Sequence, residues 1–310
     1  MSPVPRRSLL IAAFAIVSVV WGSTYLGIRV ALESYPPFFL GAARFVVAGL
    51  VLIAVGRARG EPMPSRREWG SATVTGVLFF VVGNGLVNVA EQSVSSGLAS
   101  VLVATMPLWM TVFGRLFGAT ASPREIAGVL LGLAGVVILN LGGDLRASGP
   151  GAAFALLAPM GWAMGSVASR RLPLPAGIMR TGAQMLSGGA AMLLVSVVLR
   201  EHLGEQTVRA GLALAYLCTF GSLVGFTAYS YLLEHTRPAV ATSYAYVNPV
   251  IAVVLGIAMA GEKFGLESAA GALVVLAAVA LVQKRAGSPA AIAQVRVDSH
   301  PREARRARML

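Results

Sequence analysis

The sequence predicts an all-α integral membrane protein of ten transmembrane helices, arranged as two inverted five-helix repeats. Three observations predict this fold. The 310-residue chain is 56% hydrophobic and only 12% charged, whereas soluble domains carry about 25% charged residues. Apolar runs long enough to span a bilayer recur along the whole chain. Landmarks of the first half return in the second half at a constant offset.

Each predicted span is a continuously apolar run bounded by charged or turn-forming residues, whereas a transmembrane barrel would show short alternating segments. The first run follows Arg6 and Arg7 as a signal peptide would. It lacks a clear small-x-small cleavage site, exceeds the usual apolar core of such peptides, and is copied in the second half. We therefore expect spans over residues 9–29, 38–56, 69–90, 97–116, 126–142, 151–169, 178–199, 211–233, 239–260 and 268–282.

The distribution of basic residues predicts that both termini are cytoplasmic. With that orientation, 19 of the 25 Lys and Arg residues fall in cytoplasmic segments and 4 in outer loops, as the positive-inside rule requires. Arg29 and Arg44 stand near the outer ends of spans one and two, where we expect them to snorkel to the surface. The net charge of +12 is thereby explained without a nucleic-acid partner.

The repeat divides the chain into four parts. Residues 1–7 are a cytoplasmic N-terminus, residues 8–142 the first repeat, residues 150–285 the second, and residues 286–310 a disordered basic cytoplasmic tail. Because five is odd, the second repeat enters the membrane from the opposite side. Inverted repeats are typical of secondary transporters, which bind substrate near the midplane between the halves. At offsets of 141 or 142, the matching pairs are Trp21 and Trp162, Arg29 and Arg170, Gly83 and Gly225, Pro107 and Pro249, and Glu125 and Glu267.

Several short motifs resemble the ten-helix EamA-like branch of the drug/metabolite transporter superfamily over about residues 8–285. They are Trp21-Gly22-Ser23, Arg44-Phe45, and Asn248-Pro249 followed by Gly261-Glu262. The first half departs from the pattern, because Thr120 stands where the second half has Glu262. The resemblance implies a multi-pass protein of the bacterial inner membrane that moves small metabolites. Members of the YddG type export aromatic and other neutral amino acids.

The ionisable residues constrain the cargo. Glu33, Glu91, Glu234 and Glu262 lie at span ends or in loops, and no Asp lies within a span. A buried carboxylate for a cationic drug is therefore missing, as are the several Lys or Arg that a phosphorylated cargo would need. We expect a small neutral or zwitterionic cargo, with an amino acid favoured and export the expected direction. The alternative is a multidrug or other metabolite exporter with a promiscuous aromatic pocket.

Polar and aromatic side chains inside the spans predict the substrate cavity. Asn84 and Asn88 are four residues apart and share a helix face, and spans eight and nine carry further polar residues such as Ser222 and Tyr244. For each residue, helix–helix packing is the alternative role. The predicted lining is Trp21, Thr24, Gly83, Asn84, Val87, Asn88, Ala104, Met106, Trp162, Ser166, Tyr229, Tyr246 and Asn248.

Two prolines at equivalent places, Pro107 and Pro249, predict paired hinges in spans four and nine. Interrupted helices at corresponding positions indicate a transporter's binding site, and a static kink is the alternative. Spans five and ten, with Gly128 and Gly132 in a GxxxG, are expected to be scaffold outside the cavity. The sequence predicts no enzyme, metal or cofactor, since it lacks a nucleophile–base pair, a Walker motif and a metal-ligand cluster. Lipid and a small molecule are the expected partners, and a monomer is compatible with the sequence.

Overall fold

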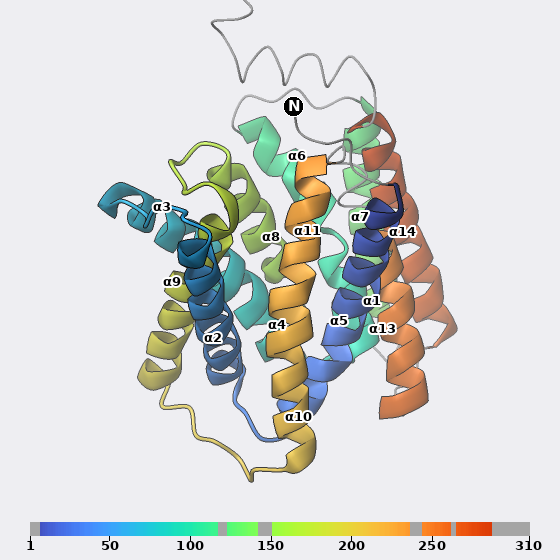
Figure 1. Ribbon diagram of the computed structural model, residues 1–310. Coiled ribbons are helices and arrows are strands. Elements are labelled where there is room, and N and C mark those ends of the chain that lie inside the picture. The colour runs from blue at the N-terminus through green and yellow to red at the C-terminus, as the bar shows by residue number, and fades with distance from the viewer. Residues whose placement is uncertain (1–6, 117–122, 142–150, 236–243, 262–264, 287–310) are drawn as a thin grey trace, which may run out of the picture.

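A computed structural model describes residues 7–116, 123–141, 151–235, 244–261 and 265–286. Within these ranges the chain forms helices joined by short connections (Figure 1). The helical segments follow the order and nearly the bounds of the predicted spans. They are α1 (Arg7–Ala31), α2 (Pro37–Ala58), α3 (Arg66–Gly76) continuing as η1 (Val77–Gly85) and α4 (Leu86–Ala90), α5 (Ser96–Val103), α6 (Met106–Leu116), α7 (Pro123–Leu141), α8 (Gly151–Ser169), α9 (Gly177–Val198), α10 (Val208–Tyr216) continuing as η3 (Leu217–Val224) and α11 (Gly225–His235), α13 (Tyr244–Ala260) and α14 (Leu266–Ala286).

The outer surface of the helices is apolar, as a lipid environment requires. Among the described residues, seven helical segments are long and apolar enough to cross a bilayer, and Val247–Ala260 and Ala269–Ala278 are shorter apolar stretches. Large aliphatic side chains stand on outer faces, with Leu194 65% exposed and Leu130 62% exposed. Extended exposed apolar surface marks contact with a membrane or partner. The expectation of an all-α membrane protein is confirmed.

Helices α2 and α9, which are equivalent under the repeat, pack antiparallel against each other. A Cβ atom built on Gly189 would lie 2.8 Å from the backbone nitrogen of Val46, and one on Gly182 would lie 3.1 Å from that of Ile53. As residue numbers rise along α2, they fall along its partner. The two halves are therefore inverted relative to each other, and the glycines let the backbones touch.

Helices α7 and α14 repeat this arrangement at another edge of the molecule (Figure 1). A Cβ atom on Gly135 would lie 2.9 Å from the backbone nitrogen of Val275, and one on Gly132 would lie 3.4 Å from the Cβ atom of Ala278. The contact is again antiparallel. Among the described residues, neither helix contributes to the cavity described below, as expected of scaffold helices.

A glutamate after the second helix of each half caps the equivalent helix of the other half. The carboxylate of Glu201 accepts hydrogen bonds from the backbone nitrogens of Phe38 (3.2 Å) and Phe39 (2.9 Å), at the start of α2. The carboxylate of Glu61 accepts one from the backbone nitrogen of Met179 (3.1 Å), at the start of α9. A negative charge at a helix N-terminus is stabilising, so these reciprocal caps join the halves at both ends of the α2–α9 pair.

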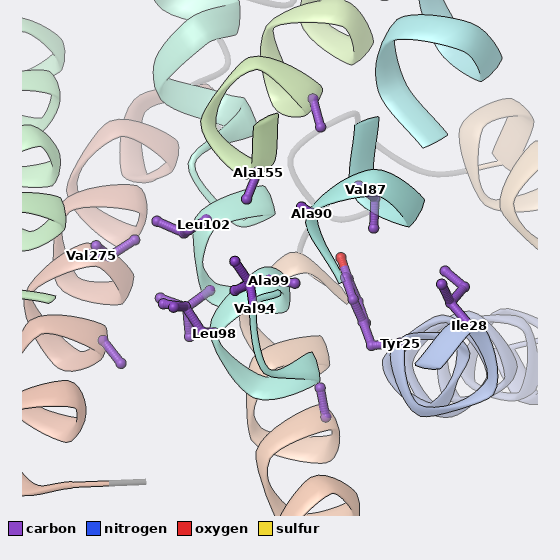
Figure 2. Packing of buried hydrophobic residues seen from close by; sticks show 14 of the residues in the cluster. Tyr25, Ile28, Val87, Ala90, Val94, Leu98, Ala99, Leu102, Ala155 and Val275 are labelled. Carbon is purple, nitrogen blue, oxygen red and sulfur yellow. The ribbon is translucent and has the colours of Figure 1, made fainter. Parts of the chain in front are cut away.

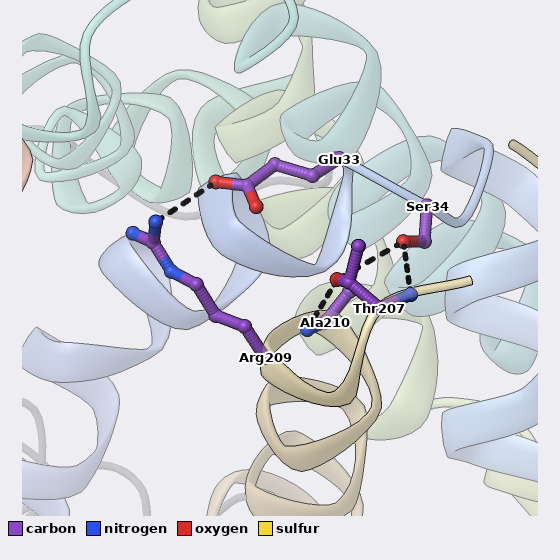
Figure 3. Close-up of polar contacts among 5 residues, drawn as sticks. All are labelled: Glu33, Ser34, Thr207, Arg209 and Ala210. Carbon is purple, nitrogen blue, oxygen red and sulfur yellow. Dashed lines mark hydrogen bonds and ion pairs between the residues drawn. The ribbon is translucent and has the colours of Figure 1, made fainter. Parts of the chain in front are cut away.

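A polar cluster ties the turn after α1 to the loop before α10. The hydroxyl of Ser34 donates to the carbonyl oxygen of Glu205 at 2.6 Å and accepts from the backbone nitrogen of Thr207 at 3.3 Å. The exposed side chains of Arg209 and Glu33 form an ion pair of 3.7 Å beside it (Figure 3). The hydroxyl of Thr207 caps α10 by accepting from the backbone nitrogen of Ala210.

The helices of the two halves exchange partners. The first helix of the first half, α1, packs against α11 and α13 of the second half. The first helix of the second half, α8, packs against η1 and α6 of the first half. Each half thus completes its packing on the other, which places the inner faces of α1, α8, α11 and α13 around a shared centre.

The two prolines occupy different helical positions. Helix α5 ends at Val103, residues 104 and 105 form a turn, and α6 begins at Met106, so Pro107 is the second residue of a new helix. The fourth span is therefore interrupted just before Pro107, whose first-turn nitrogen needs no helical acceptor. Pro249 does stand inside a helix, α13. Sequence reasoning also overlooked Pro159, which lies inside α8.

Candidate functional site

A cavity of about 80 Å³ lies where the two halves meet. Residues of α1, α2, η1, α4, α5 and α6 line it from the first half, and residues of α8, α11 and α13 from the second. Figure 2 shows part of its surroundings, with the hydroxyl end of Tyr25 directed toward α4. The lining consists of Trp21, Thr24, Tyr25, Ile28, Arg44, Asn84, Val87, Ser100, Val103, Ala104, Met106, Trp162, Phe226, Tyr244 and Asn248.

The two repeat-equivalent tryptophans meet in the cavity wall. The rings of Trp21 and Trp162 lie 6.2 Å apart in an edge-to-face arrangement. Each indole packs on a glycine of the opposite half: a Cβ atom on Gly225 would lie 2.4 Å from Nε1 of Trp21, and one on Gly83 would lie 2.6 Å from Cδ1 of Trp162. Because these glycines are themselves repeat equivalents, the inverted symmetry extends to the side chains of the site.

The symmetry is broken by hydrogen bonds. The indole Nε1 of Trp21 donates to the carbonyl oxygen of Gly221 at 3.1 Å. At offset 142 the carbonyl equivalent to that of Gly221 belongs to Phe79, and it accepts from Nδ2 of Asn84 at 3.0 Å instead. The two halves therefore form different hydrogen bonds around equivalent tryptophans.

The segments that carry these two carbonyls are both π-helical. Segment η1 covers Val77–Gly85 and η3 covers Leu217–Val224, at nearly equivalent places in the halves. In each, a side chain donates to the carbonyl five residues earlier, from Asn84 to Phe79 and from Ser222 to Leu217 (3.2 Å). π-Helical turns are rare and occur often at functional sites.

Arg44 is the one cation among the lining residues. Its side chain is only 5% exposed, and Nε donates to the hydroxyl oxygen of Ser222 at 2.6 Å. The guanidinium carbon lies 4.8 Å from the ring centroid of Phe45. The expectation that Arg44 snorkels to the outer surface is wrong, because neighbouring helices enclose it and supply a hydrogen-bond partner inside the protein.

Several predicted lining residues do border the cavity in the structure. Apart from the tryptophans and Asn84, they are Thr24, Val87, Ala104, Met106 and Asn248. The amide of Asn248, oriented with its nitrogen toward acceptors, donates to the carbonyl oxygens of Ser18 (3.1 Å) and Tyr244 (3.2 Å). Thr24 donates back to the carbonyl oxygen of Trp21 at 2.7 Å.

Other predicted residues lie near the cavity without bordering it. Asn88 is 3% exposed and donates to the carbonyl oxygen of Pro37 at 2.9 Å, so it binds α2 although it was predicted to share a face with Asn84. Ser166 donates within α8 to the carbonyl oxygen of Trp162. Tyr229 packs behind Trp21 at a ring distance of 5.2 Å, and Gly83 lies behind Trp162. The side chains of Tyr246 and Pro107 lie outside the described part of the chain.

Seven residues line the cavity that the sequence analysis did not assign to it, and sequence signals could have identified three of them. On α1, Tyr25 and Ile28 continue the face of Trp21 and Thr24 at three- and four-residue spacing. Phe226 is the repeat equivalent of Asn84 at offset 142. Arg44 had no such signal, because its burial depends on helices that are distant in sequence. The other residues are Ser100, Val103 and Tyr244.

Among the residues whose burial the structure describes, Glu91 is the one buried acidic side chain, contrary to expectation. Glu91 stands at the end of the third span, immediately after α4, as the sequence suggests, yet it is only 2% exposed. It is not among the cavity-lining residues, and no lining residue in the described part of the chain is Asp or Glu. The cavity therefore carries one positive charge and no negative one.

Comparisons with known proteins agree with this architecture. The model of the EamA-like transporter family matches residues 8–141 and again 149–283. The chain is 42% identical over 273 residues to an uncharacterized inner membrane transporter, YedA, of Escherichia coli K12, covering 87% of this chain and 89% of that protein. It is 24% identical over 282 residues to a probable terminal-alkyne amino-acid exporter of Streptantibioticus cattleyicolor, covering 90% and 95%.

A solved protein crystal structure has the same fold. It superposes with a TM-score of 0.63 at 22% sequence identity and covers 92% of this chain and all of that one. The duplicated family match coincides with the two inverted halves, and the relatives that are similar over most of their length are transporters. The chain belongs to the EamA-like transporter family and is a membrane transporter of small molecules, not an enzyme.

Proposed function

We propose that the protein is a secondary transporter of small neutral metabolites, most readily amino acids, and that it exports them by alternating access of its two inverted halves. The observation that carries this proposal is the cavity between the halves, which both halves line with aromatic, amide and hydroxyl groups. The two halves are in different hydrogen-bonding states around their equivalent tryptophans, because the carbonyl of Gly221 accepts from Trp21 and the equivalent carbonyl of Phe79 accepts from Asn84. Exchange of these two states between the halves would expose the cavity to each side of the membrane in turn.

The size and charge of the cavity favour a small cargo. Its volume of about 80 Å³ is well below the about 300–1,000 Å³ of sites for drug-sized ligands. The lining combines one guanidinium with aromatic faces, which attract cations, and with amides that can orient polar groups. A zwitterion complements this combination. The name of the distant Streptantibioticus cattleyicolor relative, an amino-acid exporter, gives further support.

The proposal includes an orientation and a location. The 19 to 4 distribution of basic residues supports cytoplasmic termini, and the YedA relative supports an inner-membrane location. Since no described lining residue is a carboxylate, the cavity offers no acid for proton coupling at the substrate. Facilitated diffusion or exchange is the mode that fits.

Purified protein in liposomes tests the cargo. Labelled neutral amino acids should accumulate faster than in protein-free liposomes, unlabelled competitor should slow uptake, and an imposed pH gradient should change the rate little. A phosphorylated sugar and a lipophilic cation serve as alternative cargos. Transport confined to either of them would contradict the proposal, and transport of the cation alone would favour the multidrug alternative.

Cysteine labelling tests alternating access. Cys218 is the single cysteine, so Cys218→Ser gives a cysteine-free background. In that background, Ala104→Cys, which borders the cavity, should react with a membrane-impermeant thiol reagent, and cargo should slow the reaction. Ala99→Cys is the control, because Ala99 is 1% exposed and belongs to the buried hydrophobic cluster drawn in Figure 2. Equal reactivity at both positions would argue against a cavity that opens selectively.

A further inference from the structure

The guanidinium of Arg44 is held in place by contacts with η3. Its Nε is hydrogen-bonded to the hydroxyl of Ser222, which donates in turn to the carbonyl oxygen of Leu217. The thiol of Cys218 lies 3.7 Å from the backbone carbonyl oxygen of Arg44 and donates to it. A Cβ atom on Gly221 would lie 3.0 Å from Nη2, so the missing side chain of Gly221 makes room for the guanidinium. The segment η3 therefore fixes the arginine against the cavity.

This charge has no counterion in the described part of the chain. None of the contacts of Arg44 there is an ion pair: Nε is bonded to the hydroxyl of Ser222, and the guanidinium lies over the ring of Phe45. A cation buried without an anion is costly in a low-dielectric interior. The bond to Ser222 engages Nε alone, and no hydrogen bond of the terminal nitrogens is formed within the described residues.

Arg44 borders the cavity, and we infer that its terminal nitrogens bind the carboxylate of the cargo. Guanidinium groups recognise planar carboxylates through two parallel hydrogen bonds, and the cargo's anion would neutralise the buried charge. A single arginine suits a monocarboxylate, whereas a phosphate dianion would need more cations. This inference rests on the proposed function and deepens it, because it makes a free carboxylate the feature that the transporter requires.

The rest of the lining can receive the other end of such a molecule. Trp21 has the rings of Phe226 and Tyr244 at 5.0 Å, so several aromatic rings gather at one wall of the cavity. Aromatic faces attract an ammonium group. The amide oxygen of Asn84 has no partner among the described residues, since only Nδ2 is bonded. The cargo's carboxylate would thus lie at α2 and η3, and its ammonium at the aromatic wall or this amide.

Three leucine-related probes separate the two ends of the molecule. Leucine carries both charges, 4-methylpentanoate carries only the carboxylate, and 3-methylbutylamine carries only the ammonium. In a thermal-shift assay on the purified wild-type protein, leucine and 4-methylpentanoate should raise the melting midpoint, and 3-methylbutylamine should not. Leucine methyl ester, which lacks the free carboxylate, should compete for leucine transport at least tenfold less well than leucine. Equal effects of the amine and the acid would overturn the inference.

Variants of Arg44 test the anchor directly. Arg44→Gln should weaken leucine binding about 10- to 100-fold, since one charge-assisted pair is lost, while its melting midpoint without ligand stays at or above that of the wild type. Arg44→Lys should retain part of the affinity, because the charge remains and the planar fork does not. Arg209→Gln is the matched control, because it removes the same charge from an exposed arginine outside the cavity. Wild-type affinity in Arg44→Gln would overturn the inference.

The outcomes distinguish this inference from the proposed function. If the wild type transports neutral amino acids but neither the methyl ester nor Arg44→Gln shows a deficit, the anchor is wrong and the function stands. If 4-methylpentanoate stabilises the wild type but not Arg44→Gln, and no amino acid is transported, the anchor stands and the cargo assignment is wrong. If Arg44→Gln does not fold, the ligand series on the wild-type protein still decides.

Discussion

The contact between Trp21 and Gly225 gives the sharpest structural prediction. Replacing Gly225 with alanine would place a Cβ atom 2.4 Å from Nε1 and 3.0 Å from Cδ1 of Trp21. Ordinary contacts begin near 3.4 Å, so the indole edge must move by about 1 Å. The ring is 8% exposed and enclosed by Phe226 and Tyr244 at 5.0 Å and Tyr229 at 5.2 Å. It cannot move without displacing them.

The cost of Gly225→Ala has two parts. Overpacking in a closed core costs about 1–3 kcal/mol, and rotating the indole would break its bond to the carbonyl oxygen of Gly221, worth about 1 kcal/mol. A helical glycine-to-alanine change returns about 1 kcal/mol. We therefore expect the free energy of unfolding to fall by about 1–3 kcal/mol and transport per folded molecule to fall with the displaced wall.

Two matched variants make this measurement specific. Gly83→Ala is the repeat equivalent, with a Cβ atom 2.6 Å from Trp162, but that indole is only half-buried, so its loss should be smaller. Gly70→Ala has nothing within 4 Å and should be neutral or stabilising. Thermal unfolding in detergent and liposome transport normalised to folded protein are the assays. If Gly225→Ala melts and transports like Gly70→Ala, the reasoning about the indole contact is refuted.

Three further predictions concern the prolines, the topology and a helix cap. Pro249→Ala restores a backbone donor inside α13, so that helix should be no less stable, whereas Pro107→Ala changes a first-turn residue of α6 and should change stability little. Transport per folded protein should fall in both variants if the interruptions serve as hinges; wild-type rates in both would leave static kinks as the explanation. Reporter fusions at Gly60 and Gly143 should report the cytoplasm and the outside respectively, and the same side for both would contradict the orientation of the first repeat. Ser65→Ala removes the hydroxyl that accepts from the backbone nitrogen of Glu68 at the start of α3, while the bond from the backbone nitrogen of Ser65 to the Glu68 carboxylate can remain. The free energy of unfolding in detergent should fall by about 1 kcal/mol, with transport preserved; an unchanged melting midpoint would show that this cap does not limit stability.

Much of the architecture could be predicted because its signals are local or periodic. Each span is an apolar run whose length matches a bilayer, and the helices begin and end near the predicted residues. The inverted duplication follows from a repeated offset and an odd number of spans in each half. The antiparallel contact between the equivalent helices α2 and α9 confirms it. The pairing of Trp21 with Trp162 across the halves is a consequence of that symmetry.

The site could be predicted only in part, because a helical residue's direction depends on its neighbours. Asn84 and Asn88 have the same chemistry and helical spacing, yet Asn84 borders the cavity and Asn88 is bonded to α2. Likewise Pro107 reads as a helix interior from its apolar surroundings, although the chain breaks two residues before it. The hydropathy of the sequence reveals neither the carbonyl of Pro37 that accepts from Asn88 nor the turn at residues 104 and 105.

By itself, the sequence determined that the chain is a membrane protein of two inverted halves, because bilayer-length apolar runs and a constant repeat offset can be read directly from it. Only the tertiary structure decided the electrostatics of the site. Arg44 would snorkel from an isolated helix. In the folded protein, Ser222 of η3, which is 178 residues away in sequence, offers its hydroxyl to the guanidinium, and Gly221 leaves space for it. A charge stays inside a membrane protein where such partners offset the loss of water, and those partners come together only when the halves pack.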